Sequence, residues 1–128
     1  MVYAKSSKNC YLIPTRIDVA LKIVTSVNLS HPVFGDALVE VTGVSRSYVH
    51  QCCTILVNNN ILLGKRGYRG GYLLARSPED IKVIEVINAV SKPEDRANIT
   101  RIVTKHLLEQ SEGLTISDLN KEIEDEKH

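Results

Sequence analysis

The sequence of 128 residues predicts a mainly α-helical fold with one small β-hairpin. Apolar residues recur at spacings of three and four in several segments, which is the period of a helix that is buried on one face. A glycine-rich stretch, Lys65 to Tyr72, lies between two short apolar runs and suits the tip of a hairpin. The length is sufficient for one compact domain and too short for two independent ones.

The first helix is expected to begin at Thr15, after a polar N-terminal arm at residues 1–11. Thr15 is a candidate N-cap, because its hydroxyl can accept a hydrogen bond from the first turn. One apolar stripe follows it along the chain, made by Ile17, Ala20, Leu21, Val24 and Val27. The stripe predicts one buried helix face.

Two further helices are expected on either side of Gly43-Val44-Ser45. The first runs from about Phe34 to Thr42, and Gly43 can adopt the positive φ of a helix C-cap. Ser45 can cap the second helix. Two short helices joined by such a turn are typical of a helix-turn-helix. The residues expected to face inward are Ala37, Leu38 and Val41 in the first helix and Val49, Cys52, Cys53, Leu56 and Val57 in the second.

The second of these helices leaves a polar face outside its buried stripe. In a helix-turn-helix, the N-terminal residues of the second helix reach base edges in the major groove, and Arg, Gln and Ser side chains can pair with bases there. An ordinary α-hairpin with a solvated polar face is the alternative, and this segment alone does not exclude it. The candidate DNA-binding residues are Ser45, Arg46, Ser47, Tyr48, His50 and Gln51.

The glycine-rich stretch follows the second helix directly. Asn58-Asn59-Asn60 can end the helix, because Asn tolerates the left-handed region. Ile61 to Leu63 and Tyr72 to Leu74 then read as the two strands of the hairpin, and this order of elements is a winged helix. The basic side chains of the hairpin tip can contact phosphates or enter a narrow minor groove. They are Lys65, Arg66 and Arg69.

Beyond the hairpin we expect further helices. Ser77 and Pro78 predict a capped helix start, and the apolar stretch that follows can begin extended, because it is apolar on more than one face. A long helix is expected from about Arg96 to Glu112, and another starts after Leu114 with Thr115 as its cap. The tail from Lys121 to His128 is expected to fray. We divide the chain into an arm (1–11), a winged helix-turn-helix DNA-binding domain (12–90), and a dimerisation helix with its tail (91–128).

Charge is distributed unevenly along the chain. Residues 1–76 contain nine Lys/Arg and three Asp/Glu, a net charge of +6, whereas residues 77–128 contain seven and twelve, a net charge of −5. Such asymmetry is expected where one half meets an anionic partner, although solvated surface charge also produces it. No apolar run is long enough to span a bilayer, so we expect a cytoplasmic protein without a membrane partner.

Neither an active site nor a metal site can be assembled from the sequence. The four histidines have no metal-ligand spacing, and no nucleophile, base and orienting residue can be matched. We therefore expect no enzyme. Cys52 and Cys53 fit small side chains in a core, and a redox switch is the alternative; Cys10, in the arm, is the better candidate for an exposed thiol.

The recognition-helix and hairpin motifs also carry a family resemblance. They are Gly43 to Tyr48, Leu62 with Leu63, Arg66-Gly67, Gly70 to Ala75 and Ser77 to Ile81. In these motifs the chain resembles the bacterial winged-helix regulator family that includes IscR, NsrR and CymR, the Rrf-two family. The similarity extends less closely from Arg16 to Leu119 and covers about four fifths of the chain.

The resemblance implies a homodimer that binds two half-sites of an operator in double-stranded DNA, and we expect a repressor. It places the recognition helix in the major groove and the wing near the minor groove, and it implies that the helix from Arg96 to Glu112 crosses to the partner subunit. A regulatory protein and a small-molecule effector are further candidate partners.

The chain departs from the cluster-bearing members of this family. Those members carry three cysteines between the helix after the wing and the dimer helix, and the segment from Ser91 to Ile99 has none. We therefore expect no iron–sulfur cluster and no other cofactor. Two alternatives stay open: a winged-helix module that docks an acidic protein partner, and a cluster held across a dimer by Cys10, Cys52 or Cys53.

Overall fold

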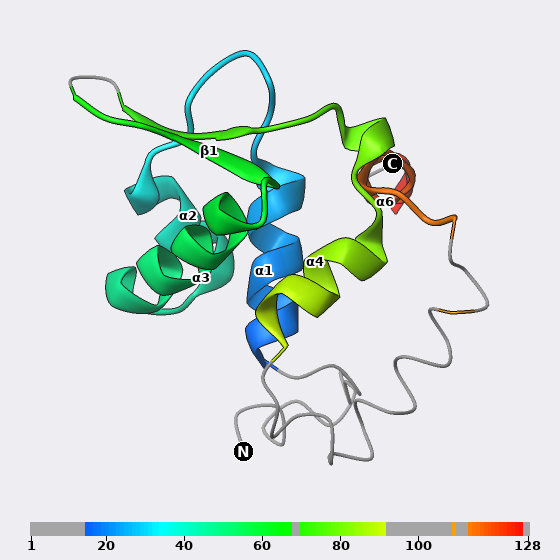
Figure 1. The fold of residues 1–128 in the computed structure, drawn as a ribbon, viewed down its shortest axis with the longest axis horizontal. Helices are drawn as coiled ribbons and strands as arrows, with labels where there is room; N and C mark the ends of the chain where they lie inside the picture. The colour runs from blue at the N-terminus through cyan, green and yellow to red at the C-terminus, as the bar shows by residue number, and fades with distance from the viewer. Residues whose placement is uncertain (1–14, 68–69, 92–108, 110–112, 127–128) are drawn as a thin grey trace.

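The computed structural model describes residues 15–67, 70–91, 109 and 113–126. Helix α1 lies at the centre and contacts α2, α3, α4 and α6, and the hairpin projects beyond them (Figure 1). This is the expected mainly α fold with one hairpin. Its elements are α1 (Thr15–Ser26), α2 (Gly35–Thr42), α3 (Arg46–Asn58), β1 (Leu62–Lys65), β2 (Gly71–Leu74), the 3₁₀ helix η3 (Pro78–Asp80), α4 (Val83–Val90) and α6 (Ile116–Glu126).

The turn between α2 and α3 has both predicted caps. Gly43 adopts a φ of 73°, and its backbone N–H donates to the Val39 carbonyl at 2.8 Å. The Ser45 hydroxyl accepts a hydrogen bond from the backbone N–H of Tyr48 at 3.1 Å. These two residues end one helix and begin the next within three positions, which fixes the direction in which α3 leaves the turn.

The expected inward face of α2 was partly wrong. Leu38 is fully buried, but Ala37 is exposed and the Val41 side chain is 50% exposed. The second inward position belongs to Thr42, one helical turn after Leu38. Its hydroxyl donates to the Leu38 carbonyl at 2.7 Å, so this polar group is buried without losing a hydrogen bond.

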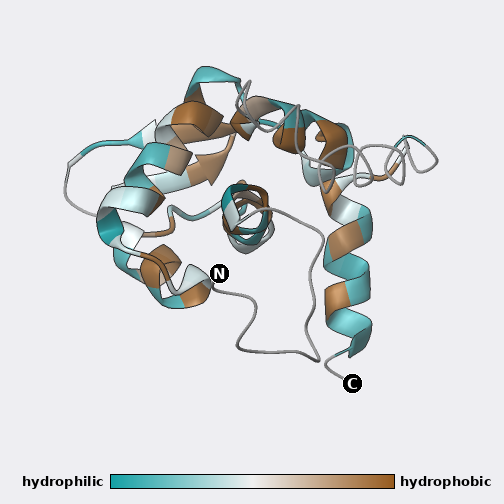
Figure 2. Ribbon diagram, turned by 90° about the horizontal axis from the view of Figure 1, so that it is seen from below, coloured by the Kyte–Doolittle hydropathy of each residue, from teal (hydrophilic) through white to brown (hydrophobic). Residues whose placement is uncertain are grey.

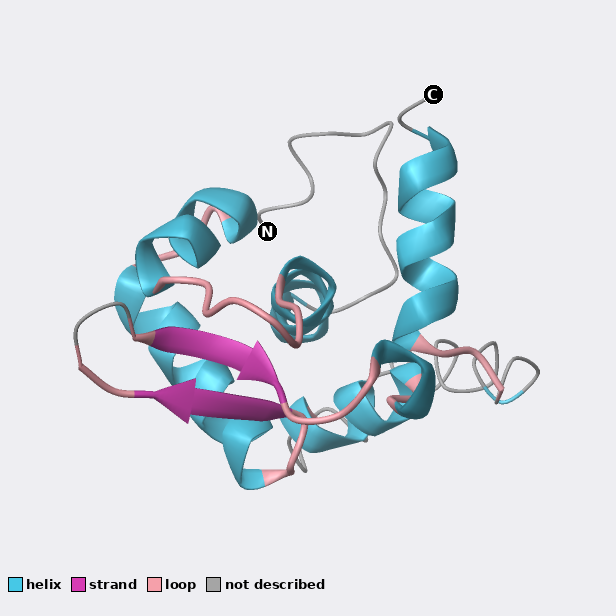
Figure 3. Ribbon diagram, turned by 90° about the horizontal axis from the view of Figure 1, so that it is seen from above, coloured by secondary structure: helices cyan, strands magenta, loops and turns pink. Residues whose placement is uncertain are grey.

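The hairpin pairs β1 with β2 in antiparallel register from Leu62 opposite Leu74 to Lys65 opposite Gly71 (Figure 3). The first strand begins at Leu62, one residue later than expected. Asn60, two residues before Leu62, adopts a left-handed φ of 60°, as we expected for this Asn-rich helix end.

A third segment supports the outer edge of β2. Val33, in the loop between α1 and α2, exchanges two backbone hydrogen bonds with Tyr72, each of 2.9 Å. A Cβ atom at Gly71 would lie 2.5 Å from the Val33 carbonyl oxygen, so the close approach needs glycine. The base of the wing is therefore attached to the helical body through its second strand.

The segment after the wing differs from the predicted capped helix. The Ser77 side chain makes no cap bond, and the residues after it form only the short helix η3. Ile81 is extended, as expected, and α4 begins at Val83. The Glu85 carboxylate accepts a hydrogen bond from the backbone N–H of Lys82 at 3.1 Å and so caps α4 in place of the serine.

Helix α6 begins with the predicted cap and runs further than expected. The Thr115 hydroxyl accepts from the Asp118 N–H at 3.3 Å, and the Asp118 carboxylate accepts from the Thr115 N–H at 3.0 Å. The helix continues to Glu126, so the expectation of a frayed tail was wrong for residues 121–126. Lys and Glu are good helix formers and sustain it beyond its buried first residue, Ile116.

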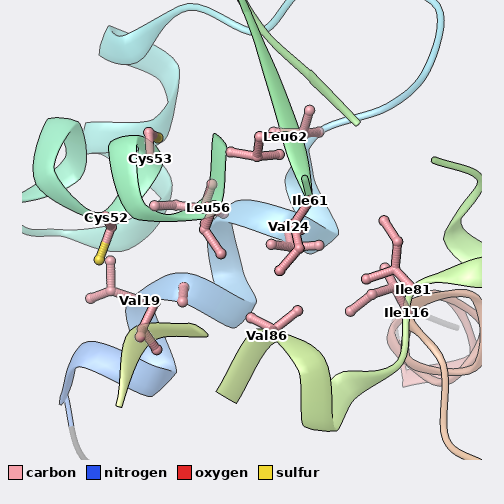
Figure 4. Close-up of a cluster of buried hydrophobic side chains, with 14 of the residues drawn as sticks. Val19, Val24, Cys52, Cys53, Leu56, Ile61, Leu62, Ile81, Val86 and Ile116 are labelled. Atoms are coloured by element: carbon pink, nitrogen blue, oxygen red, sulfur yellow. The ribbon is translucent and has the colours of Figure 1, made fainter. Parts of the chain in front are cut away.

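One hydrophobic core joins the described elements. It receives side chains from α1, α3, the start of β1, α4 and the first turn of α6 (Figure 4). The described helices carry bands of hydrophobic and hydrophilic residues, as expected for helices that cover such a core (Figure 2). Ile116 and Ile81 lie side by side, joined by a backbone hydrogen bond of 2.9 Å. The arm at 1–11 and, except for Glu109, the predicted helix from Arg96 to Glu112 lie outside the described residues.

Candidate nucleic-acid interface

Helix α3 presents most of the predicted recognition residues on its outer side. Its opposite side is fixed by Val49, Cys52, Cys53 and Leu56, which are buried in the core. Because these residues set the rotation of α3, the side chains at the start of its outer face are accessible. Five of the six candidates are exposed: Ser45, Arg46, Ser47, His50 and Gln51. The sixth, Tyr48, is half-buried and packs against the core.

Arg46 is also held by a neighbouring helix. Its Nη2 forms an ion pair with Oδ1 of Asp36, in the first turn of α2, and both side chains remain more than 70% exposed. The sequence did not indicate this pair, because Asp36 and Arg46 lie on different helices and no local spacing relates them. The acid is therefore an addition to the candidate site.

A cleft of about 470 Å³ separates the outer part of α3 from the wing. On the α3 side it is lined by His50 and Val57, and on the wing side by Lys65 and Arg66. The fold thus brings His50 to the same cleft as Lys65 and Arg66, which lie fifteen and sixteen positions later in the sequence. Gly64, Gly71 and Tyr72 complete the lining. Arg69, the remaining candidate, lies outside the described residues.

The wing and α3 are also joined inside the molecule. The Tyr72 hydroxyl and the Cys53 thiol are hydrogen-bonded. Burial raises the pKa of the Cys53 thiol to about 12, and burial also raises the pKa of Tyr72. At neutral pH the thiol is therefore protonated and poorly nucleophilic, which favours a packing role over redox chemistry.

Arg76, just after the end of β2, forms three hydrogen bonds at the base of the wing. Its guanidinium donates to the carbonyls of Asn60 at 3.2 Å and Asp80 at 3.0 Å, and to the Glu85 carboxylate at 2.7 Å. The hydrogen bond from Arg76 lowers the pKa of Glu85. One side chain thus ties the end of α3 and the start of α4 to the strand that leaves the wing.

The described part of the chain shows no clustered ligands for a metal. Within these residues, no three His, Cys, Asp or Glu side chains lie close enough together to hold an ion. No helix in the same part of the chain is both long and apolar enough to cross a membrane.

Solved structures share this fold. A structure described as T. potens IscR aligns with 96% of this chain and 95% of its own, with a TM-score of 0.71 and 23% identity. The structure of CymR, described as the global cysteine regulator of B. subtilis, aligns with 85% of this chain and 95% of its own, with a TM-score of 0.67 and 22% identity. At these identities the likeness establishes the winged-helix fold.

Curated relatives are more similar in sequence. The HTH-type transcriptional regulator IscR of Klebsiella pneumoniae (strain 342) is 37% identical over 90 residues, which make up 70% of this chain and 52% of that protein. IscR of Escherichia coli O9:H4 (strain HS) is 36% identical over the same length. The chain spans about half the length of these relatives.

A family model covers nearly the whole chain. The model for Rrf2, described as an iron-dependent transcriptional regulator, matches residues 13–127. This is a family of regulators and not of enzymes, in agreement with the prediction from the sequence. The chain therefore belongs to the Rrf2 family of transcriptional regulators.

Proposed function

We propose that this chain is a sequence-specific DNA-binding regulator that acts as a homodimeric repressor. Each subunit places α3 in the major groove of one half of a palindromic operator and its wing near the adjacent minor groove. One observation carries the proposal: the exposed polar face of α3 and the basic wing border the same cleft. A surface of this kind can contact base edges and phosphates at the same time.

The start of α3 supports a role in reading bases. Arg46, Ser47 and Gln51 are exposed and carry side chains that can pair with base edges in the major groove. Ser45 caps the helix and so fixes the direction of its first turn. His50, the residue before Gln51, lies where α3 borders the cleft. A rigid helix that carries these residues would enter the groove with little rearrangement.

The wing supports a role in binding the DNA backbone. Lys65 and Arg66 are exposed, and they line the cleft opposite His50. Cations in this position can neutralise phosphates next to the groove that α3 reads. We assign Arg69, near the wing tip in the sequence, to the same contact or to the minor groove, where negative potential is greatest when the groove is narrow.

A homodimer would match the symmetry of a palindromic operator. One copy of α3 reads only a few base pairs, and two copies spaced about 34–36 Å apart reach successive major grooves on one side of the duplex. We assign the dimer contact to residues 91–128, with the predicted helix from Arg96 to Glu112 as its main element. DNA as the partner also implies a cytoplasmic protein.

Cys52 and Cys53 argue against an iron–sulfur cluster. Cys52 and Cys53 are buried in the core, and burial raises the pKa of both thiols, whereas a cluster needs thiolates. The sequence has no cysteine between Ser91 and Ile99. We propose that this member works without a cluster, and we expect anaerobic purification to give a colourless, iron-free protein. A visible absorption band with bound iron would contradict this.

Selection of bound DNA from a random pool tests the proposed function. We expect the enriched sequences to share one palindrome, because two identical subunits read the same half-site in opposite directions. Arg69→Ala should weaken binding to that site by about 1–3 kcal/mol, whereas Lys121→Ala, on α6, should leave it unchanged.

The competing function is that of a protein-interaction module. If no sequence is enriched at any salt concentration, and the basic surface binds an acidic protein instead, DNA recognition would be rejected. If Arg69→Ala and Lys121→Ala bind equally well, only the wing tip would lose its assigned role.

A further inference from the structure

The ion pair between Asp36 and Arg46 joins the two helices of the helix-turn-helix at the DNA-reading end of α3. Arg46 is the first residue of α3, and Asp36 lies in the first turn of α2. The Arg46 Nη2 contacts the Asp36 Oδ1, and the side chains are 71% and 73% exposed. The pair therefore lies at the surface that would face DNA, not in the core.

Holding the helices together is not the main effect of such a pair. Water and salt screen ion pairs between exposed side chains, so they add little to the stability of a fold. The packing of Leu38, Val49 and Cys53 already fixes α2 and α3 in place. What the pair changes is the freedom of the Arg46 side chain, which would otherwise sample many rotamers in water.

An anchored arginine is suited to reading guanine. The guanidinium has five N–H donors in a planar fork, and Asp36 contacts one terminal nitrogen of it. Guanine presents two acceptors, N7 and O6, at the spacing of that fork. Fixing the side chain before it binds lowers the entropy lost on binding, and it favours one approach direction over others.

The negative charge of Asp36 also acts against phosphate contacts by Arg46. A guanidinium that bound a phosphate from this position would bring the Asp36 carboxylate toward the phosphate oxygens, and like charges repel. A base edge carries no such charge. The pair thus weakens sequence-independent binding and leaves a contact to a base edge as the favourable one.

We propose that Asp36 is a specificity-determining residue, which positions Arg46 to read a guanine in each half of the operator. Asp36 acts through Arg46 and need not touch DNA itself. The inference rests on the proposed function and deepens it, because it names the base and the residue that selects for it.

The experiment measures the ratio of affinities for the selected operator and for a random duplex, by fluorescence anisotropy at one fixed salt concentration. Asp36→Asn should lower this ratio about twofold to fivefold, and mainly by weakening the preference for guanine at one position. Asp36→Glu keeps the charge but moves the carboxylate by one methylene, and it should lower the ratio as well. In an Arg46→Gln background, Asp36→Asn should not change the ratio further.

Glu40→Gln is the matched control. Glu40 is another exposed acid on α2, and it forms no ion pair with a residue in the described part of the chain. Its substitution removes the same charge and should strengthen binding to both duplexes equally, so that the ratio is unchanged. Thermal unfolding should show the same midpoint for all variants, because both acids are exposed.

Two results would overturn the inference. One is an equal ratio for Asp36→Asn and Glu40→Gln, which would reduce Asp36 to a general negative charge. The other is a normal ratio for Asp36→Glu, which would show that the position of the carboxylate has no effect. If the wild-type protein selects no operator from the random pool, the proposed function is contradicted, and the proposed role of Asp36 is contradicted with it.

Discussion

Gly71 is the residue at which the wing meets the loop between α1 and α2. Its φ of 150° is strained for any residue with a side chain, and a Cβ would lie 2.5 Å from the Val33 carbonyl oxygen. Gly71→Ala should therefore lower the free energy of unfolding by about 1–3 kcal/mol, measured by urea denaturation.

Gly35→Ala is the control for that substitution. A Cβ there meets nothing within 4 Å, and alanine is the better helix former. We expect no loss of stability. If both variants were as stable as the wild type, the close contact between β2 and Val33 would be wrong.

Cys53 should make the stability of the protein sensitive to alkaline pH. Burial raises its pKa from 9.0 to about 12, so between these values the unfolded chain loses a proton that the folded protein keeps. Its contribution is therefore fully present below pH 9 and is lost as the pH rises toward 12, by about 1 kcal/mol for each pH unit.

Cys53→Ala should remove this part of the pH dependence. Urea denaturation at pH 8 and pH 10.5 gives the comparison, because other groups that titrate in this range are common to both proteins. A wild-type protein that loses no more stability than Cys53→Ala over this interval would contradict the burial of the thiol.

Some features of single residues could be predicted from the sequence, and others could not. Ser45, Gly43 and Asn60 were predicted correctly, because a helix cap or a left-handed residue depends on the few residues around it. The contact between Asp36 and Arg46 was missed, because it depends on how two helices cross. The inward position of Thr42 was missed for a different reason: polar residues are usually exposed, and this one is buried because its hydroxyl is hydrogen-bonded inside its own helix.

At the scale of elements, the long periodic helices were the most predictable. The expected stripe of the first helix is buried except for Leu21, which is half-buried. Val19 and Ile23 are buried as well, because α1 lies at the centre of the fold (Figure 1). Helix α2 is only two turns long, so its pattern allowed more than one inward face, and packing against α1 and α3 decided between them. The prediction that Ser77 caps an α-helix was wrong. Its side chain makes no cap hydrogen bond, and the residues after it form only the short 3₁₀ helix η3.

Arg76 is expected to determine how firmly the wing is anchored. It donates to two carbonyls and to Glu85, and its side chain is 29% exposed. Arg76→Ala would leave these partners without their donor, and we expect the free energy of unfolding to fall by about 1–2 kcal/mol. Arg66→Ala, an exposed arginine of the wing, should change it by less than about 0.5 kcal/mol. Equal losses in the two variants would argue against this anchor.

The charges of the wing are expected to act through phosphate contacts. Lys65→Ala and Arg66→Ala should each weaken binding to operator and random DNA alike, and each should reduce the slope of log affinity against log salt by about 1. Lys121→Ala supplies the control, because it removes a cation from α6, away from the cleft. If a substitution weakened binding to the operator alone, the substituted wing residue would instead contact a base.

At the scale of the whole molecule, the order of the elements along the chain was predictable from the sequence. The cleft that α3 and the wing line together was not. The sequence placed a helix-turn-helix before a basic hairpin and so predicted the winged helix. The cleft between His50, Lys65 and Arg66 depends on the bridge between Val33 and Tyr72 and on the buried contact between Tyr72 and Cys53. Such contacts join segments that are far apart in the chain, and no local pattern reports them. The division into domains and the dimer helix remain predictions.

The affinity ratio between the selected palindrome and a random duplex, followed over a series of salt concentrations, tests the central claim most directly. We predict binding to the palindrome with about 10³-fold preference or more, and a steep decrease of both affinities with salt. Equal affinity for the two duplexes at every salt concentration would contradict the account. It would mean that the basic surface binds DNA but that α3 does not distinguish one base sequence from another.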